Sequence, residues 1–359
     1  MIVRAIPRFL KLPIYAFDIS DFSYKFLRLE EYGASSRVAE FGEGDIAPGI
    51  IQGGEIKNRT ALTDILRDVV RRYHIRFIAL SLPDEKGFVR SLTMPMTAVK
   101  KNEIGQALGL QLEEYVPLPP GEVVFDHTLI GEDKDHYDVV LRAMPRSLIE
   151  DYCEVITAAG AVPVLIEQEL GAIAKAVVPK DLNDTGMILD WGKSRTSFAV
   201  FHRGVVHFSA TVSIGGSSLT EEIAKQMKIS IADAEQVKKA KARIALDPES
   251  IKNDEIMQML MPMITVLREE AEKYIQYWQS HSEADARPSK LLLTGGDVHI
   301  PGFAEYLSRE LGIAVVPADP WANVRFPEKY IPELSWKDSL RFVCVIGLCI
   351  KANEDNMIV

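Results

Sequence analysis

The stretch from Met187 to Lys225, MILDWGKSRTSFAVFHRGVVHFSATVSIGGSSLTEEIAK, decides the fold of this chain. Its first apolar residues, Met187 to Leu189, predict a buried strand that ends at Asp190 and is followed by a small polar turn. Two more strands are predicted over residues 197–201 and 205–210, with a glycine-containing turn between them. An aspartate at a strand end, followed by glycine and hydroxyl side chains, suits a hydrated Mg²⁺ together with phosphate oxygens.

A glycine pair, Gly215 and Gly216, opens a helix that is predicted from Ser217 to Met227. Because the first N–H groups of a helix lack partners within it and its dipole is positive there, we expect free N–H groups beside the same anion. Gly192 offers open backbone in the preceding turn, and Thr196 offers a hydroxyl. A plain hairpin with a glycine-rich connection is the alternative for either half alone.

Length and composition indicate a folded chain with more than one core. Its 359 residues exceed what a single core usually holds, so two domains or one split domain are expected. Hydrophobic residues make up 47% of the chain and charged residues 26%, as in globular proteins rather than disordered ones. The formal net charge of −10 argues against general nucleic-acid binding.

The cysteines and the apolar runs bear on the compartment. Cys153, Cys344 and Cys349 have neither metal-ligand spacing nor the number that a disulfide framework needs, so we expect reduced core residues of a cytoplasmic protein. No apolar run is long enough to span a bilayer, and no signal peptide is recognised. The basic, apolar segment from Met1 to Pro13 is expected to be a frayed arm rather than a weak membrane-surface segment.

The layout of the central stretch occurs a second time near the N-terminus. Ile14 to Asp18 is a short apolar run that ends in an aspartate, and Lys25 to Glu30 is the next run. The turn between them contains no glycine. Two strand–Asp–turn–strand units that face a cleft can clamp a nucleotide between two similar domains.

An inserted module separates the two copies. A helix over residues 59–72 and a strand over 76–82 precede it, and a strand over 163–166 and a helix over 170–177 follow it, as if the first domain resumed. The module is an αββα unit, with a helix at 101–115, strands at 123–130 and 137–144, and a helix at 146–159.

The proline-rich stretch from Tyr115 to Pro120 ends the first helix of this module. It forms either the edge of the module's core or part of a peptide-binding cleft, and its apolar, exposed character slightly favours the cleft.

A second glycine turn follows the central stretch. Helices are predicted over residues 231–245 and 254–280, and a strand over 290–294 leads to Gly295-Gly296 and a helix over 304–311. A glycine pair after a buried strand lets the backbone pass close to a flat ligand such as a nucleoside.

Taken in order, these segments resemble the actin-like ATPase superfamily, above all its bacterial branch of FtsA-type division proteins and PilM-type pilus assembly proteins. The resemblance rests on the phosphate segments at Asp18 and Asp190, the adenosine segment from Leu292 to Gly302, and Ala234-Glu235-x-x-Lys238, which resembles a helix that contacts ribose and adenine. The PilM type is favoured by segments that keep that family's order: Ser81-Leu82-Pro83, Arg90, Met94-Pro95, the run from Glu113 to Pro119, and Val123-Val124-Phe125-Asp126. The resemblance extends from about Tyr15 to Ile350.

The resemblance implies an α/β chain with the actin-like ATPase fold, in which two ribonuclease-H-like domains enclose a nucleotide cleft. An FtsA/PilM-type αββα subdomain is inserted into the first domain. The implied subdomains are 1A at 1–90 and 164–184, 1C at 91–163, 2A at 185–214 and 289–359, and 2B at 215–288.

ATP and Mg²⁺ are the implied cofactors. Asp18 and Asp190 are the implied metal-binding residues, and Glu169 is a candidate for orienting an attacking water. The implied cofactor-binding residues are Asp18, Lys25, Asp190, Gly192, Thr196, Gly215, Gly216, Glu235, Lys238, Gly295 and Gly296. The structural alternatives are a turn cap for either aspartate, a solvated strand lysine for Lys25, a helix-start carboxylate for Glu169 and a surface pair for Glu235 and Lys238.

Two departures from the superfamily pattern bear on the chemistry. Asp18-Ile19-Ser20-Asp21 stands where the family usually has Asp-Ile-Gly-Thr, and Asp297 replaces a small residue after the glycine pair. Loss of the glycine hinders close backbone approach, and Asp21 is expected to add negative charge where a triphosphate would sit. Weak or lost nucleotide binding and slow or absent hydrolysis are therefore expected.

The implied function is a cytoplasmic ATP-binding scaffold of a type IV pilus or related secretion platform. It would be peripheral to the inner membrane through partners and would bind the cytoplasmic N-terminal tail of a PilN-like membrane protein, with self-association left open. The alternatives are an FtsA-like division protein and an active ATPase or sugar-kinase-like phosphotransferase. The absence of an amphipathic helix at Lys351 to Val359 argues against the first alternative, and the absence of a sugar-site motif argues against a kinase.

Overall fold

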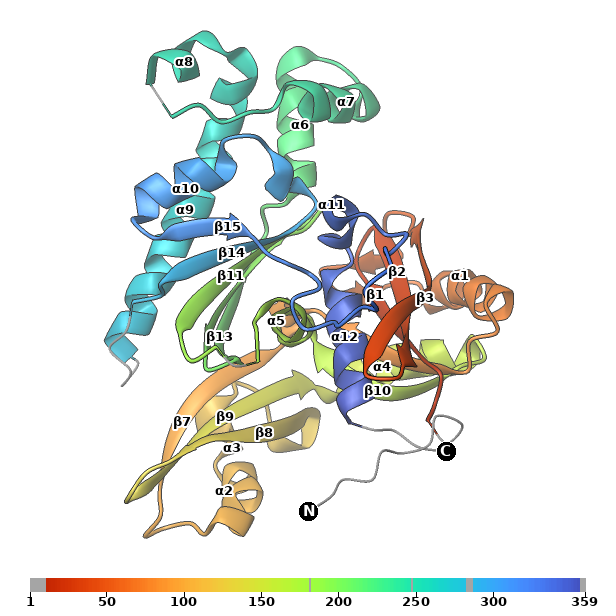
Figure 1. Cartoon of the computed structure of the whole chain (residues 1–359), viewed down its shortest axis with the longest axis vertical. Helices are drawn as coiled ribbons and strands as arrows, with labels where there is room; N and C mark the ends of the chain where they lie inside the picture. Colours follow the sequence, from red (N-terminus) through yellow and green to blue (C-terminus); the bar gives the residue numbers. More distant parts are fainter. Residues whose placement is uncertain (1–10, 181, 247, 282–286, 356–359) are drawn as a thin grey trace.

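Two five-stranded sheets of the same topology form the centre of the protein (Figure 1). The computed structural model describes residues 11–180, 182–246, 248–281 and 287–355. The first sheet contains β1 (Ile14–Ile19), β2 (Ser23–Tyr32), β3 (Ser35–Asp45), β6 (Phe77–Leu82) and β10 (Val162–Gln168), in the order β10-β6-β1-β2-β3. The second contains β11 (Thr185–Trp191), β12 (Thr196–His202), β13 (Val205–Val212), β14 (Lys290–Gly295) and β15 (Ala314–Pro317), in the order β13-β12-β11-β14-β15.

The pairing repeats from one sheet to the other. In each sheet, three antiparallel strands connected by turns lead to two parallel neighbours. β1 and β11 are the central strands, and each carries its aspartate near its C-terminal end. The predicted duplication of the strand–Asp–turn–strand unit is therefore confirmed.

Helices cover both faces of the first sheet. Successive side chains of a strand point to opposite faces, and apolar side chains lie on both faces of β1. Tyr15, Phe17 and Ile19 pack with α1 (Arg59–Arg72) and α4 (Arg146–Ala158). On the other face, the small side chain of Ala16 lies toward α5 (Glu169–Val177) and α12 (Val343–Glu354). Residues 343–354, which were predicted to belong to subdomain 2A, thus pack on the first sheet.

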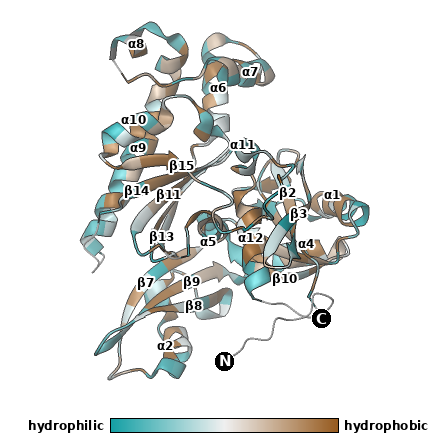
Figure 2. Ribbon diagram, viewed as in Figure 1, coloured by the Kyte–Doolittle hydropathy of each residue, from teal (hydrophilic) through white to brown (hydrophobic). Residues whose placement is uncertain are grey.

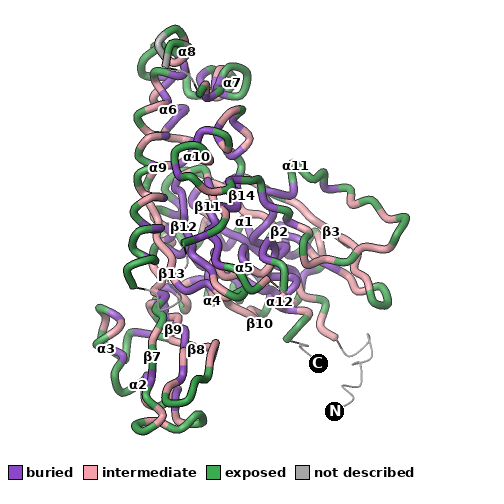
Figure 3. The backbone as a smooth tube through the Cα atoms, turned by 60° about the vertical axis from the view of Figure 1, so that its left-hand side comes forward, coloured by how far each residue is buried: buried purple, intermediate pink, exposed green. Residues whose placement is uncertain are grey.

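The largest buried cluster of the described residues joins the second sheet to α5 and α12. Figure 2 shows hydrophobic residues along β14 and β15, and Figure 3 shows buried residues along the strands of this sheet. The long helix α9 (Glu255–His281) packs one stripe of side chains on this core, including Leu260, Ile264 and Leu267. The other helices of this half are α6 (Gly216–Met227), α7 (Ile231–Lys241), α8 (Pro248–Asn253), α10 (Phe303–Leu311) and α11 (Trp336–Ser339).

The inserted module contains one strand more than predicted. Its sheet has the order β7-β9-β8, with β7 (Phe88–Pro95), β8 (Val123–Glu132) and β9 (His136–Pro145). The helix predicted over 101–115 is divided into α2 (Ile104–Leu110) and α3 (Leu112–Tyr115), in a segment where two glycines lower the helix propensity. The side chains of α4 pack with the first sheet rather than with this one.

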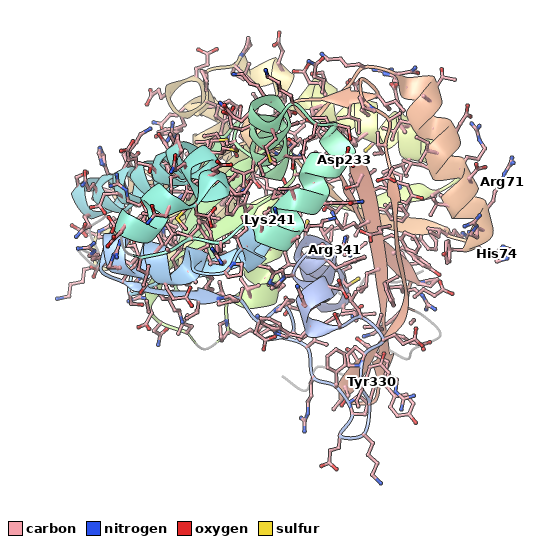
Figure 4. All side chains as sticks on the ribbon, turned by 90° about the horizontal axis from the view of Figure 1, so that it is seen from above. Arg71, His74, Asp233, Lys241, Tyr330 and Arg341 are labelled. Carbon is pink, nitrogen blue, oxygen red and sulfur yellow. The ribbon has the colours of Figure 1, made fainter. Side chains whose placement is uncertain are left out.

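The edge strand β3 was not predicted, because its pattern lacks a buried face. Glycines in β3 make room for aromatic rings of β2: a Cβ at Gly42 would lie 2.6 Å from the ring of Phe26. A segment of the second half covers this edge, where the Tyr330 hydroxyl lies 3.1 Å from the backbone N of Val38. Figure 4 labels Tyr330 beside the end of these strands. The short hairpin of β4 (Ile51–Gln52) and β5 (Glu55–Ile56) follows β3.

Two predictions about the chain ends fall partly outside the described residues. They concern residues 1–10 of the N-terminal arm and residues 356–359 of the tail. Within the ranges that the structure describes, no helix combines the length and hydrophobicity needed to cross a membrane.

Candidate functional site

A cavity of about 870 Å³ lies between the two sheets and takes side chains from both halves. Its volume is within the range of small-molecule sites, about 300–1,000 Å³. Nine of the twelve predicted site residues line it: Asp18, Lys25, Glu169, Asp190, Gly192, Glu235, Lys238, Gly295 and Gly296. Residues far apart in the sequence therefore meet at one cavity, although their contacts with a ligand stay predictions.

The two predicted metal-binding aspartates are held in matching ways. The hydroxyl of Ser81, on β6, donates to Asp18 Oδ1 at 3.0 Å. The hydroxyl of Thr294, on β14, donates to Asp190 Oδ1 at 2.7 Å. β6 and β14 are the equivalent parallel neighbours in the two sheets, so the duplication includes a hydroxyl that orients each carboxylate.

These aspartates fit a hydrated magnesium ion. Asp18 Oδ2 lies 3.9 Å from Lys25 Nζ. Burial raises the pKa of Asp190, because an ionised carboxylate is poorly solvated inside the protein. Among the described residues, no group of three or more His, Cys, Asp and Glu side chains is arranged to hold a metal. Mg²⁺ commonly uses one or two carboxylates and completes its shell with water and substrate phosphates, so Asp18 and Asp190 would hold it together with a nucleotide.

Glu169 begins α5 and lies in a buried cluster of charged groups. Burial raises the pKa of Glu169, and the Arg195 guanidinium opposes this shift. Arg195 Nη2 lies 3.5 Å from Glu169 Oε2, and Arg195 Nη1 lies 3.2 Å from Glu85 Oε1. Asp84 Oδ2 accepts the Leu170 N–H at 2.6 Å and so caps α5 beside this cluster. The sequence gives no local sign of a role for Arg195, because an arginine in a turn is normally solvated.

The side chain of Asp21 is bonded to the backbone of a neighbouring turn. Its carboxylate accepts the N–H groups of Gly53 and Gly54, at 3.1 and 3.0 Å, and it does not line the cavity. Asp21 therefore holds the β4–β5 turn and lies 3.8 Å from Arg195 Nη1. These backbone donors hold the Asp21 carboxylate outside the lining of the cavity, and the effect of its charge on a triphosphate stays a prediction.

The N-terminus of α6 is also used differently from the prediction. The N–H of Gly216 donates to the Gly192 carbonyl at 3.0 Å, and the N–H of Ser217 donates to the Lys193 carbonyl at 2.8 Å. A Cβ at Gly215 would lie 2.4 Å from that Lys193 oxygen, so glycine lets the β11–β12 turn pack on the helix start. The expected free N–H groups at this helix start are thus already bonded to the turn.

Three predicted phosphate-binding residues consequently lie behind the cavity wall. Gly215 and Gly216 support the turn, and the hydroxyl of Thr196 donates to the Ile214 carbonyl at 2.6 Å. None of the three lines the cavity. Ser217 lines it and was not predicted.

The predicted adenosine end contains a buried lysine with three acceptors. Lys238 Nζ lies 3.0 Å from Glu235 Oε2, 2.9 Å from Asp297 Oδ1 and 3.0 Å from the Gly216 carbonyl oxygen. The hydroxyl of Thr220 donates to Glu235 at 2.6 Å. The pair Glu235–Lys238 is therefore not a solvated surface pair, and Asp297 joins it to the glycine turn.

Comparison with known proteins identifies the family. A family model described as type IV pilus assembly protein PilM matches residues 16–353. The chain belongs to this PilM family. A chain of the solved PilM–PilN type IV pilus biogenesis complex is 19% identical and superposes with a TM-score of 0.78, covering 96% of this chain and 99% of that chain.

A second solved structure shares the fold at a lower TM-score. MreB5 of Spiroplasma citri, solved bound to ADP, is 14% identical with a TM-score of 0.53, covering 96% of this chain and 98% of that chain. These likenesses confirm the actin-like ATPase fold for this PilM family member. Cell division protein FtsA of Bacillus subtilis (strain 168) is 25% identical over 286 residues, which are 72% of this chain, and the match spans 58% of the length of FtsA.

Proposed function

We propose that this PilM family member is a nucleotide-binding scaffold of the inner-membrane platform of a type IV pilus. It works in the cytoplasm, is held at the membrane by partners, and binds the cytoplasmic tail of a PilN-like protein. Membership of the family supports the pilus assignment. The solved complex of a related PilM with PilN supports the choice of partner.

The single observation that carries nucleotide binding is the matched pair of hydroxyl-held aspartates at one cavity. Bound Mg²⁺ would neutralise phosphate charge, while Asp18 and Asp190 would fix its position through the oxygens that Ser81 and Thr294 do not bond. Glycine turns at Gly192 and Gly295-Gly296 let backbone approach the ligand. The solved MreB5 complexes with ADP and AMPPNP are consistent with a nucleotide in this fold.

ATP with Mg²⁺ is expected to stabilise the chain against heat more than ATP with EDTA. A ligand that binds only the folded state at 100 times its Kd adds about 2.7 kcal/mol to the free energy of unfolding. The measurement is a thermal-shift series with ATP or ADP, with and without Mg²⁺. Inorganic phosphate release from the same samples is expected to stay slow, because Ser20 lines the cavity where the family usually has a glycine. No shift with any nucleotide would contradict the binding proposal.

The proposed tail site lies where the inserted module meets the first domain. β8 is an edge strand of the module's sheet, and an extended peptide can add to such an edge through backbone hydrogen bonds. Val124 of β8 is 38% exposed and pairs in register with Met144, whose side chain belongs to the core of the first domain. An apolar tail side chain could therefore contact Val124 at this junction.

The proline-rich stretch contributes less exposed surface than expected. Val116 is buried in the module's core, and Tyr115 is half-buried with its hydroxyl 3.1 Å from Gln111 Oε1. Tyr115, Val116 and Leu118 thus pack in that core, while Pro117, Pro119 and Pro120 are exposed. Replacing Val116 would damage the module itself, so Val124 is the better probe of the tail site.

A labelled peptide with the cytoplasmic N-terminal residues of the same organism's PilN-type protein is expected to bind with micromolar Kd, which corresponds to about 8 kcal/mol. Val124→Lys should weaken binding by about tenfold or more, because it removes apolar contact area and adds a charge. The matched control is Val316→Lys on β15, which is the edge strand of the second sheet and is 43% exposed at this valine. Fluorescence anisotropy compares the three proteins, and equal weakening by both variants would place the tail elsewhere.

A further inference from the structure

Arg195 combines burial, charge and position in a way that the proposed nucleotide site does not yet use. It lies in the β11–β12 turn of the second domain and lines the cavity, while its side chain is only 9% exposed. Its three carboxylate neighbours, Asp21, Glu85 and Glu169, all come from the first domain. Arg195 therefore links the two domains beside the cavity.

We propose that Arg195 recognises the terminal phosphate of a nucleoside triphosphate and makes the cavity prefer a triphosphate to a diphosphate. This inference rests on the proposed binding of a nucleotide at Asp18 and Asp190. It adds a specificity-determining residue that the sequence pattern did not select.

The contacts of Arg195 leave room for such a ligand. Its distances to the carboxylates are 3.2, 3.5 and 3.8 Å, all longer than the roughly 2.7–2.9 Å of a strong charge-assisted hydrogen bond. A guanidinium has five N–H donors in a planar fork that matches two phosphate oxygens at once. A phosphate oxygen beside Arg195 would thus gain short, paired hydrogen bonds that the carboxylates do not make.

The position of the expected metal points to the terminal phosphate rather than to the inner ones. Glu169, at 3.5 Å from Arg195, lines the same cavity as Asp18 and Asp190. The nucleoside end of the cavity is marked instead by Gly295, Gly296 and Lys238. A nucleotide that extends from the glycine turn toward Asp190 therefore carries its last phosphate to Arg195.

Binding at Arg195 would also change the link between the domains. A guanidinium that bonds a phosphate loosens its hold on Glu85 and Glu169 of the first domain. A diphosphate lacks the group that competes with these carboxylates. The nucleotide state is thus expected to alter the ion pairs across the cavity.

Isothermal titration of the full chain with AMPPNP or ADP, each with Mg²⁺, tests the proposal. Arg195→Gln should lose about tenfold or more in affinity for AMPPNP, and its affinity for ADP should change much less. Arg195→Lys keeps a positive charge among the carboxylates but lacks the fork, so it should fold and lose part of the preference. Thermal melts establish that each variant is folded.

Arg341→Gln is the matched control, because Arg341 lines the same cavity at its glycine-turn end. Its Nη1 lies 3.0 Å from Glu43 Oε2 of β3, and Figure 4 shows Arg341 between α7 and the strands of the first sheet. This variant should change the affinities for AMPPNP and ADP by a similar factor.

Equal losses for both nucleotides in Arg195→Gln and Arg195→Lys, or unchanged affinities, would overturn the role of Arg195 and leave nucleotide binding standing. Failure of the unaltered chain to bind either nucleotide would overturn both proposals.

Discussion

Asp190→Ala is expected to abolish Mg²⁺-dependent ATP binding while the chain stays folded. The carboxylate lies at the end of the central strand of the second sheet, where Thr294 fixes one oxygen and leaves the other for a metal. Removing a charged partner from an enclosed site costs a few kcal/mol, about 1.5–3 for each hydrogen bond to a charged group. Since burial already raises the pKa of Asp190, alanine also removes a group that is costly to keep ionised, so the fold should tolerate it.

Asp84→Asn is the matched control for this experiment. Asp84 is also buried, belongs to the same region of charged side chains, and caps α5 through the Leu170 N–H, but it does not line the cavity. Asparagine keeps an acceptor for that N–H, so ATP binding should persist. Titration with ATP in Mg²⁺ and in EDTA compares the proteins. An Asp190→Ala protein that binds ATP with Mg²⁺ as tightly as the unaltered chain would refute the metal assignment.

The central part of the fold could be predicted because its signals are local. The short apolar runs that end in Asp18 and Asp190 predict strands without any knowledge of strand pairing. Both strands lie where they were expected. The hydroxyls of Ser81 and Thr294 could not be assigned to these aspartates from the sequence alone. They reach the carboxylates through parallel pairing of strands that are distant in the sequence. Ser81 is 63 residues from Asp18, and Thr294 is 104 residues from Asp190.

The corrections at the cavity share one physical cause, which is that tertiary partners take groups that a local pattern leaves free. The N–H of Gly216 looked available for an anion, but the Gly192 carbonyl of the packed turn accepts it. Asp21 looked like a charge in the phosphate site, but the backbone of Gly53 and Gly54 satisfies it. No local sequence pattern marks Arg195 of the β11–β12 turn, because its ion-pair partners come from the other domain.

Helix α12 shows a different limit of sequence patterns. Its residues are apolar all round, so they have no helical stripe that separates a core face from a solvent face. The structure explains this pattern, since α12 contacts both α5 and the strands of the first sheet. The two helices are in close backbone contact at Gly347 of α12. A Cβ at this position would lie 1.7 Å from the Ala172 carbonyl oxygen of α5.

Gly347→Ala is therefore expected to destabilise the chain strongly. Alanine normally favours a helix over glycine by up to about 1 kcal/mol. Here the added methyl group meets backbone atoms of α5, with the Ala172 carbonyl carbon at 2.6 Å, and backbone cannot rotate away as a side chain can. The helices must separate, and overpacking of this kind costs about 1–3 kcal/mol or more. Because α5 begins at Glu169 and α12 begins beside the cavity, nucleotide affinity should fall as well.

Gly109→Ala is expected to change the free energy of unfolding in the opposite direction. Gly109 also lies in a helix, α2, but a Cβ there would be 3.4 Å from the ring of Phe125, an ordinary contact. This variant should therefore keep or raise the free energy of unfolding, as helix propensity alone predicts. Urea unfolding followed by circular dichroism compares both variants with the unaltered chain. If Gly347→Ala were as stable as Gly109→Ala, then α12 could not pack against α5 as closely as the structure shows. The predicted loss of nucleotide affinity in Gly347→Ala would then have no structural basis.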